Sequence, residues 1–287
     1  MIDRIAKRIA NLLQNENPIV IGKGTTHTVY RVGSYACKLR TNEVSADDVL
    51  LFQIEKECSD LLIKNNVPCV TVFGVVDGNS LGHKTFSNKE VLIEEYISGE
   101  VMFNNKDLSK ENFENLYDII SDINKIEVPH FGWYPSSKEY SWSNFLSELS
   151  IQIDEYLKEN MSDVLNEYRS LDLNATYQGV PKVLMLEFNP HNFIWNGDCY
   201  KAIDVNSLLC GDPLYQWARI KMHMEIYGRK HFCDKYISQT DIKKVLKYMV
   251  LSCGSDLIMR KRIGLNCDSH ENKLRDLIHS MGAYKND

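Results

Sequence analysis

The feature that most constrains the fold of this chain is a change of hydrophobic pattern near residue 98. Before it, short runs of β-branched and aromatic residues alternate with glycine turns, which is typical of antiparallel strands. After it, apolar residues recur mostly at helical spacing. The sequence therefore predicts an α+β protein of two lobes, with a small antiparallel-sheet lobe over residues 1–97 and a larger, mostly helical lobe over residues 98–287.

The elements expected in each lobe follow from the same patterns. In the first lobe we expect a helix before Pro18, a helix over 46–64, and strands at 19–21, 28–32, 35–39, 70–76 and 90–97. In the second we expect helices at 109–125, 141–158, 160–171, 212–227, 240–252 and 269–281. Strand-like breaks occur at 183–186, 193–195 and 200–205, and Asn196-Gly197-Asp198 predicts a hairpin between the last two.

Charge and cysteine content exclude some partners. The formal net charge of −6 argues against a nucleic-acid partner, because affinity for phosphate backbones needs clustered Lys and Arg. Eight scattered cysteines without a C-x-x-C pair predict reduced thiols and a cytoplasmic protein. No apolar run approaches the length of a membrane span, so we expect no membrane association. Either a monomer or a homodimer is compatible with the sequence.

The most specific motif joins a carboxylate, an amide and a second carboxylate. Glu187 lies five residues before Asn192, and Asp204 ends the apolar stretch at Ala202-Ile203. In a magnesium-nucleotide phosphotransferase, the first carboxylate orients or deprotonates a hydroxyl, while the amide and the second carboxylate hold Mg²⁺ on the phosphates. Taken singly, the three are a loop acid, a turn cap and a strand-end residue. Together they predict phosphoryl transfer.

A lysine in the first lobe supports this interpretation. Lys38 lies on a predicted strand in Tyr35-Ala36-Cys37-Lys38, the position of a lysine that reaches the α- and β-phosphates. Glu55, on the following helix, is the expected ion-pair partner. Glu57 is a rival, but Glu55 stands seven residues before Leu62 on one helix face and is preferred. A solvated surface position remains the alternative for each acid.

The turn before residue 28 could approach phosphates. Gly22 and Gly24 lack the Cβ atoms that would obstruct the backbone, and the Thr25 hydroxyl could add a donor. A plain hairpin turn explains the two glycines equally well. His27 stands where the protein-kinase loop has its third glycine.

Other patterns point away from further chemistry. The eight histidines show no H-x-x-x-H or Cys/His spacing, which predicts no zinc site. Asp212 before Pro213 predicts a helix cap that does no chemistry. Residues 107–163 hold twelve acidic side chains and four lysines. Solvated helix faces explain most of this charge, and an acidic wall for a cationic acceptor is a further hypothesis.

These residues together resemble the aminoglycoside phosphotransferase and choline kinase-like family of small-molecule kinases. The resemblance runs from about Ile19 to Ile220 and is most specific in the Glu187–Asn192 loop, in Ile203-Asp204 and in Gly211-Asp212-Pro213-Leu214-Tyr215. Phe131-Gly132 and Trp142-x-x-Phe145-Leu146 resemble its antibiotic-kinase side, which includes hygromycin and macrolide kinases.

The resemblance implies a bilobal protein-kinase-like fold, ATP or GTP with Mg²⁺, and phosphorylation of a small-molecule hydroxyl. It implies that Lys38 contacts the phosphates and is held by Glu55, and that the backbone at Glu95 and Ile97 meets the base. Glu187 would replace the family's catalytic Asp. The implied metal ligands are Asn192 and Asp204.

Two departures leave a second function open. Met185-Leu186-Glu187 stands where the family has His-Gly-Asp, and Gln216 replaces a further acid. Glutamate moves the carboxylate by roughly 1.5 Å, and a misplacement of about 1 Å can cost about 100-fold in rate. The alternative to a kinase is therefore a pseudokinase that binds nucleotide or serves as a scaffold. Protein phosphorylation is disfavoured, since no Ala-Pro-Glu signature follows Asp204.

Overall fold

The chain folds into two compact units in a computed structural model. The first unit combines Met1–Leu108 with Asn189–Leu208, and the second combines Ser109–Phe188 with Leu209–Asp287. The first unit thus extends past the sequence-based boundary at residue 97 and includes a segment from the later half of the chain. The structure describes residues 1–24, 27–40, 46–102, 110–135, 141–186, 189–227, 236–237 and 242–283.

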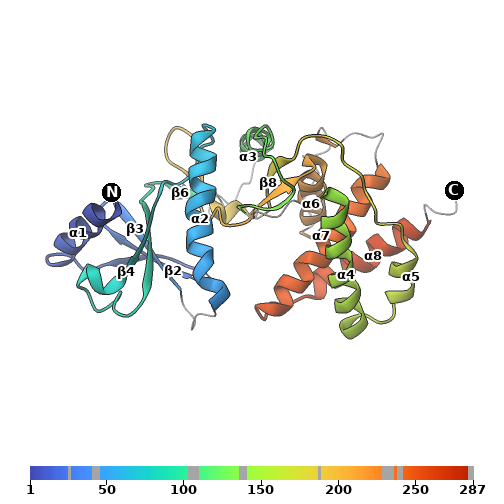
Figure 1. Ribbon diagram of the computed structural model, residues 1–287, viewed down its shortest axis with the longest axis horizontal. Helices are drawn as coiled ribbons and strands as arrows, with labels where there is room; N and C mark the ends of the chain where they lie inside the picture. The colour runs from blue at the N-terminus through green and yellow to red at the C-terminus, as the bar shows by residue number, and fades with distance from the viewer. Residues whose placement is uncertain are drawn as a thin grey trace. The chain divides into compact units, whose positions relative to one another are not determined.

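A five-stranded antiparallel sheet forms the first unit, in the order β1-β2-β3-β5-β4. Helix α1 (Ile2–Leu13) and helix α2 (Ala46–Lys64) lie on opposite faces of this sheet (Figure 1). A short 3-10 helix, η1 (Gly78–Leu81), connects the last two strands. The strands are β1 (Ile19–Lys23), β2 (His27–Val32), β3 (Tyr35–Arg40), β4 (Val72–Asp77) and β5 (Glu90–Glu95).

Strand alternation divides the buried side chains of this sheet between two small cores. Successive side chains point to opposite faces, so Cys37 and Leu39 pack with Val91, Ile93 and the apolar face of α1. The intervening residues, including Lys38 and Leu92, belong to the other face. There Leu92 packs with Phe52 of α2. The lysine is thereby directed to the helix that carries its predicted partner.

Backbone pairing explains why residues 189–208 belong to the first unit. Strand β9 (Phe193–Trp195) pairs with β6 (Glu100–Val101) and with β10 (Tyr200–Ala202), forming a three-stranded sheet with the predicted hairpin at one end. The Ala202 carbonyl accepts a hydrogen bond from the Val70 N–H at 2.8 Å. A Cβ at Gly99 would lie 1.9 Å from the Trp195 carbonyl oxygen, so only glycine permits this approach.

Helices dominate the second unit and bury one large apolar core. They are α3 (Lys110–Ile123), α4 (Trp142–Asn160), α5 (Leu165–Ser170), α6 (Pro213–Ile226), α7 (Ile242–Arg262) and α8 (Asp268–Ala283). A small sheet in the order β7-β11-β8 completes the unit, from β7 (Gly132–Trp133), β11 (Leu208–Gly211) and β8 (Lys182–Met185). The core includes Trp142, whose indole N–H donates to the Tyr248 hydroxyl at 2.8 Å.

The α+β fold class is confirmed, but some elements differ from the sequence prediction. Helix α7 runs to Arg262 rather than to residue 252, because Gly254 serves helix packing and does not end the helix. A Cβ there would lie 2.6 Å from Ile153 of α4. Strands β6, β7 and β11 were not predicted from the sequence, since their pairing partners are remote in the chain and the first two have only two residues each.

Two further features concern the cysteines and the apolar character of the helices. No disulfide joins the seven cysteines within them. Of the helices found there, none combines the length and the apolar character needed to cross a bilayer.

Candidate functional site

Lys38 and Glu55 form a buried ion pair in the first unit. Both Glu55 oxygens lie 2.9 Å from the Lys38 Nζ. The lysine is 5% exposed and the glutamate 1% exposed, so this is not the solvated surface pair that was the alternative. The rival Glu57 instead accepts a hydrogen bond from Gln53 on the exposed side of α2. The pairing expected from the sequence is therefore present.

Asp204 approaches the same lysine from a segment 166 residues further along the chain. Its Oδ1 lies 2.5 Å from the Lys38 Nζ, and its side chain is 35% exposed. The backbone of Asp204 has φ +57°, in the left-handed region that is uncommon for residues other than glycine. Such outliers persist where the surrounding structure holds them and are concentrated at functional sites.

A backbone hydrogen bond ties Asn192 to the Asp204 segment. The Ile203 N–H donates to the Asn192 carbonyl at 2.8 Å, and the Asn192 N–H donates to the Asn189 carbonyl at 2.7 Å. Asn192 ends a short 3-10 helix, η3 (Pro190–Asn192), directly before β9. The amide-bearing residue and the carboxylate are therefore held by neighbouring strands of one small sheet.

A third carboxyl group, which the sequence analysis missed, lies beside this pair. Glu94 of β5 is 7% exposed, and its carboxyl group is repelled by Glu55 and attracted by Lys38. Burial, and then repulsion from Glu55, raises the pKa of Glu94 to about 8. The signal was available, because Glu94 is a charged residue on the strand face that also carries Leu92.

The three carboxyl groups leave the cluster short of positive charge. Burial alone would lower the pKa of the Lys38 ammonium, but attraction to Glu55, Asp204 and Glu94 outweighs it and raises that pKa. The single ammonium of Lys38 thus faces the acidic side chains of Glu55 and Asp204 as well as that of Glu94. A divalent cation would offset the deficit, and the carboxylate of Asp204 and the amide of Asn192 offer the oxygen ligands that Mg²⁺ prefers. The residues present thus fit a magnesium ion.

The predicted base-binding backbone at Glu95 and Ile97 lies at the end of the same sheet. The Glu95 N–H is already used, since it donates to the Thr71 carbonyl at 2.9 Å. The Glu95 side chain pairs with Lys201 at 2.9 Å. For the Ile97 N–H, however, no hydrogen-bond partner is found in the described part of the chain. A main-chain donor of this kind can meet an acceptor of a bound ligand.

The glycines at 22 and 24 are not required by packing within the protein. Neither has a positive φ, and an added Cβ would come no closer than 3.8 Å to Val29 and 3.7 Å to the His27 carbonyl oxygen. The Gly24 N–H closes the β1–β2 turn on that carbonyl at 2.8 Å. Thr25 lies outside the described residues. Packing therefore does not explain the two glycines, and a close approach of a phosphate to the backbone remains the functional explanation.

Glu187 also lies outside the described residues, but the strand that leads to it is firmly held in the second unit. The buried Gln216 side chain accepts from the Met185 N–H at 3.1 Å and donates to the Met185 carbonyl at 2.7 Å. Arg219 donates to the Leu186 carbonyl at 2.8 Å. The glutamine that departs from the family pattern therefore braces this strand, a role that the sequence analysis did not recognise.

The predicted helix cap at Asp212 is confirmed. Its Oδ1 accepts from the Leu214 N–H at 2.9 Å, and Pro213 occupies the first turn of α6. The other oxygen, Oδ2, meets the Tyr248 hydroxyl and the Lys244 Nζ, each at 2.8 Å. Asp212 thus joins α6 to α7 within the second unit.

Solved structures with the same fold were found across nearly the whole chain, although no family model and no curated protein matches the sequence. Aminoglycoside phosphotransferase APH(4)-Ia, as a thermostable mutant in a ternary complex with ADP and hygromycin B, is 14% identical, with a TM-score of 0.65 over 96% of this chain and 97% of that chain. The GDP complex of aminoglycoside 2'-phosphotransferase-IIIa is 14% identical, with a TM-score of 0.60 over 98% of both chains.

A protein assigned as a fructosamine-3-kinase of Haemophilus somnus 129PT is also 14% identical, with a TM-score of 0.61 over 96% of both chains. At these identities the likeness shows the fold. The kinase-like fold implied by the sequence resemblance is therefore confirmed.

Proposed function

We propose that this chain is a magnesium-dependent kinase of small molecules, which transfers the γ-phosphoryl group of ATP or GTP to a hydroxyl group. The observation that carries the proposal is the buried Lys38, whose Nζ lies 2.9 Å from Glu55 and 2.5 Å from Asp204. Phosphoryl transfer draws most of its acceleration from positioned charge, so a lysine aimed by a buried acid is its central requirement.

Each residue of the first unit takes a role that its surroundings support. Glu55 holds Lys38 on the nucleotide phosphates, and Asp204 with Asn192 holds Mg²⁺. The ion shields the negative charge of the phosphates when bound. On nucleotide binding, a phosphate oxygen would replace Asp204 beside Lys38, and Glu55 would remain paired with it. The backbone at Gly22 and Gly24 and the hydroxyl of Thr25 are proposed to contact the phosphates.

The base would be bound by the main chain at the end of β5. The Ile97 N–H, which has no partner among the described residues, supports a donor role towards the base. The Glu95 carbonyl is proposed as the companion acceptor. Main-chain contacts of this kind orient the nucleotide without restricting the acceptor.

Glu187 is proposed to orient and deprotonate the attacking hydroxyl. The hydrogen bonds of Gln216 and Arg219 support this role, because they hold the backbone of Met185 and Leu186, the two residues that precede Glu187. General bases of this kind typically contribute about 100- to 10,000-fold to a rate.

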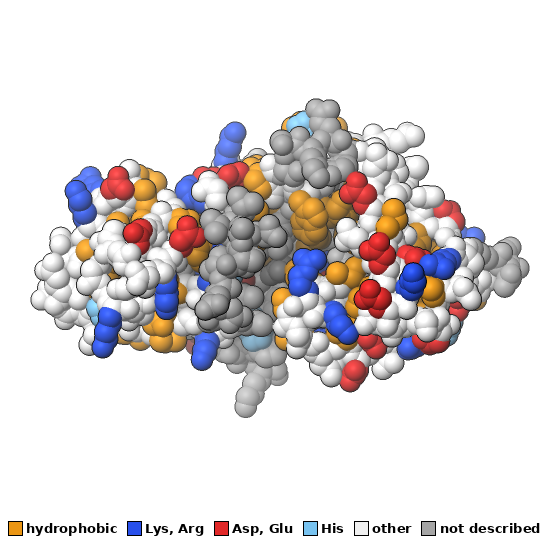
Figure 2. All heavy atoms as spheres, turned by 60° about the horizontal axis from the view of Figure 1, so that its bottom comes forward, with side chains coloured by type: hydrophobic (Ala, Val, Ile, Leu, Met, Phe, Trp, Pro, Cys, Tyr) orange, Lys and Arg blue, Asp and Glu red, His pale blue; other side chains and the backbone are white. Residues whose placement is uncertain are grey.

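The acceptor is proposed to be an aminoglycoside-like or other cationic alcohol in the cytoplasm. Structural neighbours in complex with hygromycin B support this class. The acidic segment supports it less than its composition suggests, because Asp154 is already paired with Arg169 and Asp163 with Arg275. On the face drawn in Figure 2, acidic side chains of the second unit lie among Lys and Arg.

Thermal unfolding with and without nucleotide tests the proposal directly. Mg·ATP or Mg·GTP at 100 times its dissociation constant should stabilise the protein by about 2.7 kcal/mol. The Asp204→Ala variant should lose this stabilisation in Mg²⁺, whereas Asp198→Ala, an exposed acid of the β9–β10 hairpin, should retain it. Stabilisation by nucleotide that is unaffected in Asp204→Ala would refute the metal-ligand role.

Turnover separates the kinase from its alternative. A pooled screen of aminoglycosides, macrolides and choline-like alcohols should show nucleotide-dependent phosphorylation that requires Mg²⁺. Binding without turnover across the screen would instead favour a nucleotide-binding pseudokinase, for which the Met185-Leu186-Glu187 sequence is the supporting observation.

A further inference from the structure

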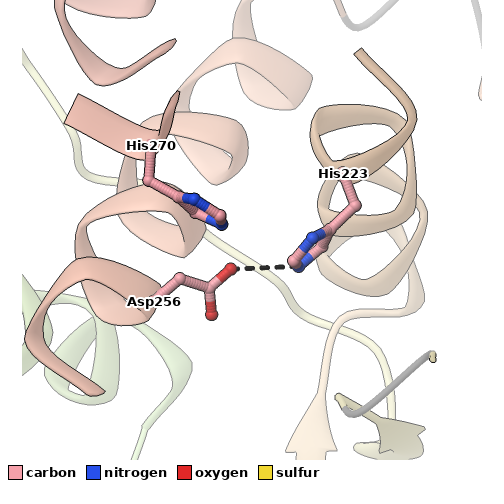
Figure 3. A group of neighbouring side chains, drawn as sticks. All are labelled: His223, Asp256 and His270. Atoms are coloured by element: carbon pink, nitrogen blue, oxygen red, sulfur yellow. Dashed lines mark ion pairs between the residues drawn. The ribbon is translucent and has the colours of Figure 1, made fainter. Parts of the chain in front are cut away.

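Three potential metal ligands converge from three helices of the second unit. His223 lies on α6, Asp256 on α7 and His270 on α8. Their side chains point toward one another, and one ligand atom from each lies within 4.8 Å of the others (Figure 3). They are far apart in the sequence, so they form no spacing motif. The sequence prediction that no zinc site exists rested on that spacing alone.

The two oxygens of Asp256 have different surroundings. Oδ1 meets the Arg219 Nη1 at 2.6 Å. Oδ2 lies 3.0 Å from the His223 Nε2, yet it is buried without an aligned hydrogen bond among the described residues. One oxygen is therefore committed to a guanidinium, while the other faces the two imidazoles.

His270 supplies a second, independent observation. The residue is 2% exposed, and no hydrogen-bond partner for its buried Nδ1 is found within the described ranges. A buried polar group without a partner costs about 1–3 kcal/mol, so native proteins rarely keep one without a reason. The ring points toward Asp256 and His223 (Figure 3).

We propose that His223, Asp256 and His270 bind a first-row transition-metal dication of the zinc type. Two imidazoles with one carboxylate suit Zn²⁺ and its neighbours, whereas Mg²⁺ and Ca²⁺ prefer oxygen ligands throughout. The site is therefore chemically distinct from the proposed magnesium site of the first unit. A zinc ion would connect α6, α7 and α8, and water would complete its coordination.

The geometry needs only local adjustment. Tetrahedral Zn²⁺ with bonds of about 2.1 Å sets its ligand atoms about 3.4 Å apart, closer than the 4.8 Å limit within which the three atoms now lie. Side-chain rotation can supply this contraction. The His223 side chain is 23% exposed and provides a route for the ion.

Arg219 sets the expected strength of the site. Its guanidinium holds Asp256 ionised and oriented, as partners of metal ligands commonly do. Its positive charge also opposes a second cation close by, so we expect weaker binding than at thiolate zinc sites. The expected stoichiometry is one ion per chain.

Zinc titration of the full chain, without a histidine tag and after treatment with a chelator, tests the proposal. A competing chromophoric chelator measures the affinity, and Co²⁺ substitution reports the ligands through its absorption spectrum. The variants are His223→Gln, which alters a partly exposed side chain, and His270→Gln. The matched control is His279→Gln, an α8 histidine whose side chain is 59% exposed.

We expect one equivalent of Zn²⁺ in the wild type and in His279→Gln, and affinity reduced at least tenfold in the other two variants. The Co²⁺ spectrum should lack a thiolate charge-transfer band. Unchanged affinity in His223→Gln, a thiolate band, or no stoichiometric binding to the wild type would each overturn the proposal. If His270→Gln does not fold, His223→Gln decides alone. The titration contains no nucleotide, so its outcome is independent of the proposed kinase activity.

Discussion

Glu94 allows the electrostatics of the first unit to be tested quantitatively. Its pKa is about 8 in the folded protein, against an ordinary value of 4.5, chiefly because the carboxyl is buried. Each pH unit of difference corresponds to about 1.4 kcal/mol. Because the pKa of Glu94 is higher in the folded protein than in the unfolded chain, folding favours the protonated carboxyl. The free energy of unfolding therefore falls as the pH rises from about 4.5 to about 8.

Replacing Glu94 by Gln removes this titration and keeps a hydrogen-bond donor beside Glu55. At pH 7, which is 2.5 pH units above the ordinary pKa of 4.5, the variant should be more stable than the wild type by about 3 kcal/mol. Near pH 4 the two should be nearly equal. The exposed Glu90 on the same strand provides the control, because Glu90→Gln should leave the pH dependence unchanged.

The measurement must report on the first unit, because two units can unfold separately. Hydrogen exchange followed by mass spectrometry, at peptides covering β3 and β5, gives the opening free energy of this sheet as a function of pH. The reasoning is refuted if Glu94→Gln retains the wild-type slope between pH 5 and pH 8. If Glu94→Gln and Glu90→Gln show the same pH dependence of the opening free energy, that dependence arises from other titrating groups.

The remaining predictions concern the catalytic carboxylate, the glycine turn and the helix cap. In steady-state kinetics with an identified acceptor, Glu187→Gln should lower kcat by about 100-fold or more, whereas Glu187→Asp should raise it. Equal rates in the wild type and both variants would exclude a catalytic role. Gly24→Ala should change the free energy of unfolding by less than about 1 kcal/mol, since the added Cβ makes only ordinary contact at 3.7 Å, yet weaken nucleotide binding in a titration. Asp212→Ala should lower the free energy of unfolding, measured by urea denaturation, by about 2–4 kcal/mol, because the cap and the buried contact with Lys244 are lost. Asp212→Asn should recover the cap. An Ala variant as stable as the wild type would contradict the bracing role.

Much of the fold could be predicted from the sequence because its signals are local. The β-branched runs and glycine turns identified the five strands of the first unit, and helical spacing identified the helices of the second. Helix α7 was predicted too short, ending at residue 252, whereas it continues through Gly254, a glycine that packs against Ile153 of another helix. A residue that serves a distant neighbour gives a misleading local signal.

The candidate site shows the same division. Lys38, Glu55, Asn192 and Asp204 could be selected from residue type, order and strand or helix position. Glu94 was missed as a third carboxyl group although it lies on the strand face of Leu92, and the sequence offered no basis for selecting Gln216 as a brace. Both act through side-chain contacts with segments remote in the chain, and such contacts leave no periodic trace.

The sequence by itself determined which segments are strands and helices, and which residue types phosphoryl transfer would require. Only the tertiary structure decided that Asp204 reaches Lys38 across 166 residues of chain, and that His223, Asp256 and His270 meet at all. Hydrophobic periodicity fixes the face on which a side chain lies, because it follows from local backbone geometry. The partner opposite that face is selected by packing between elements, which no local pattern encodes.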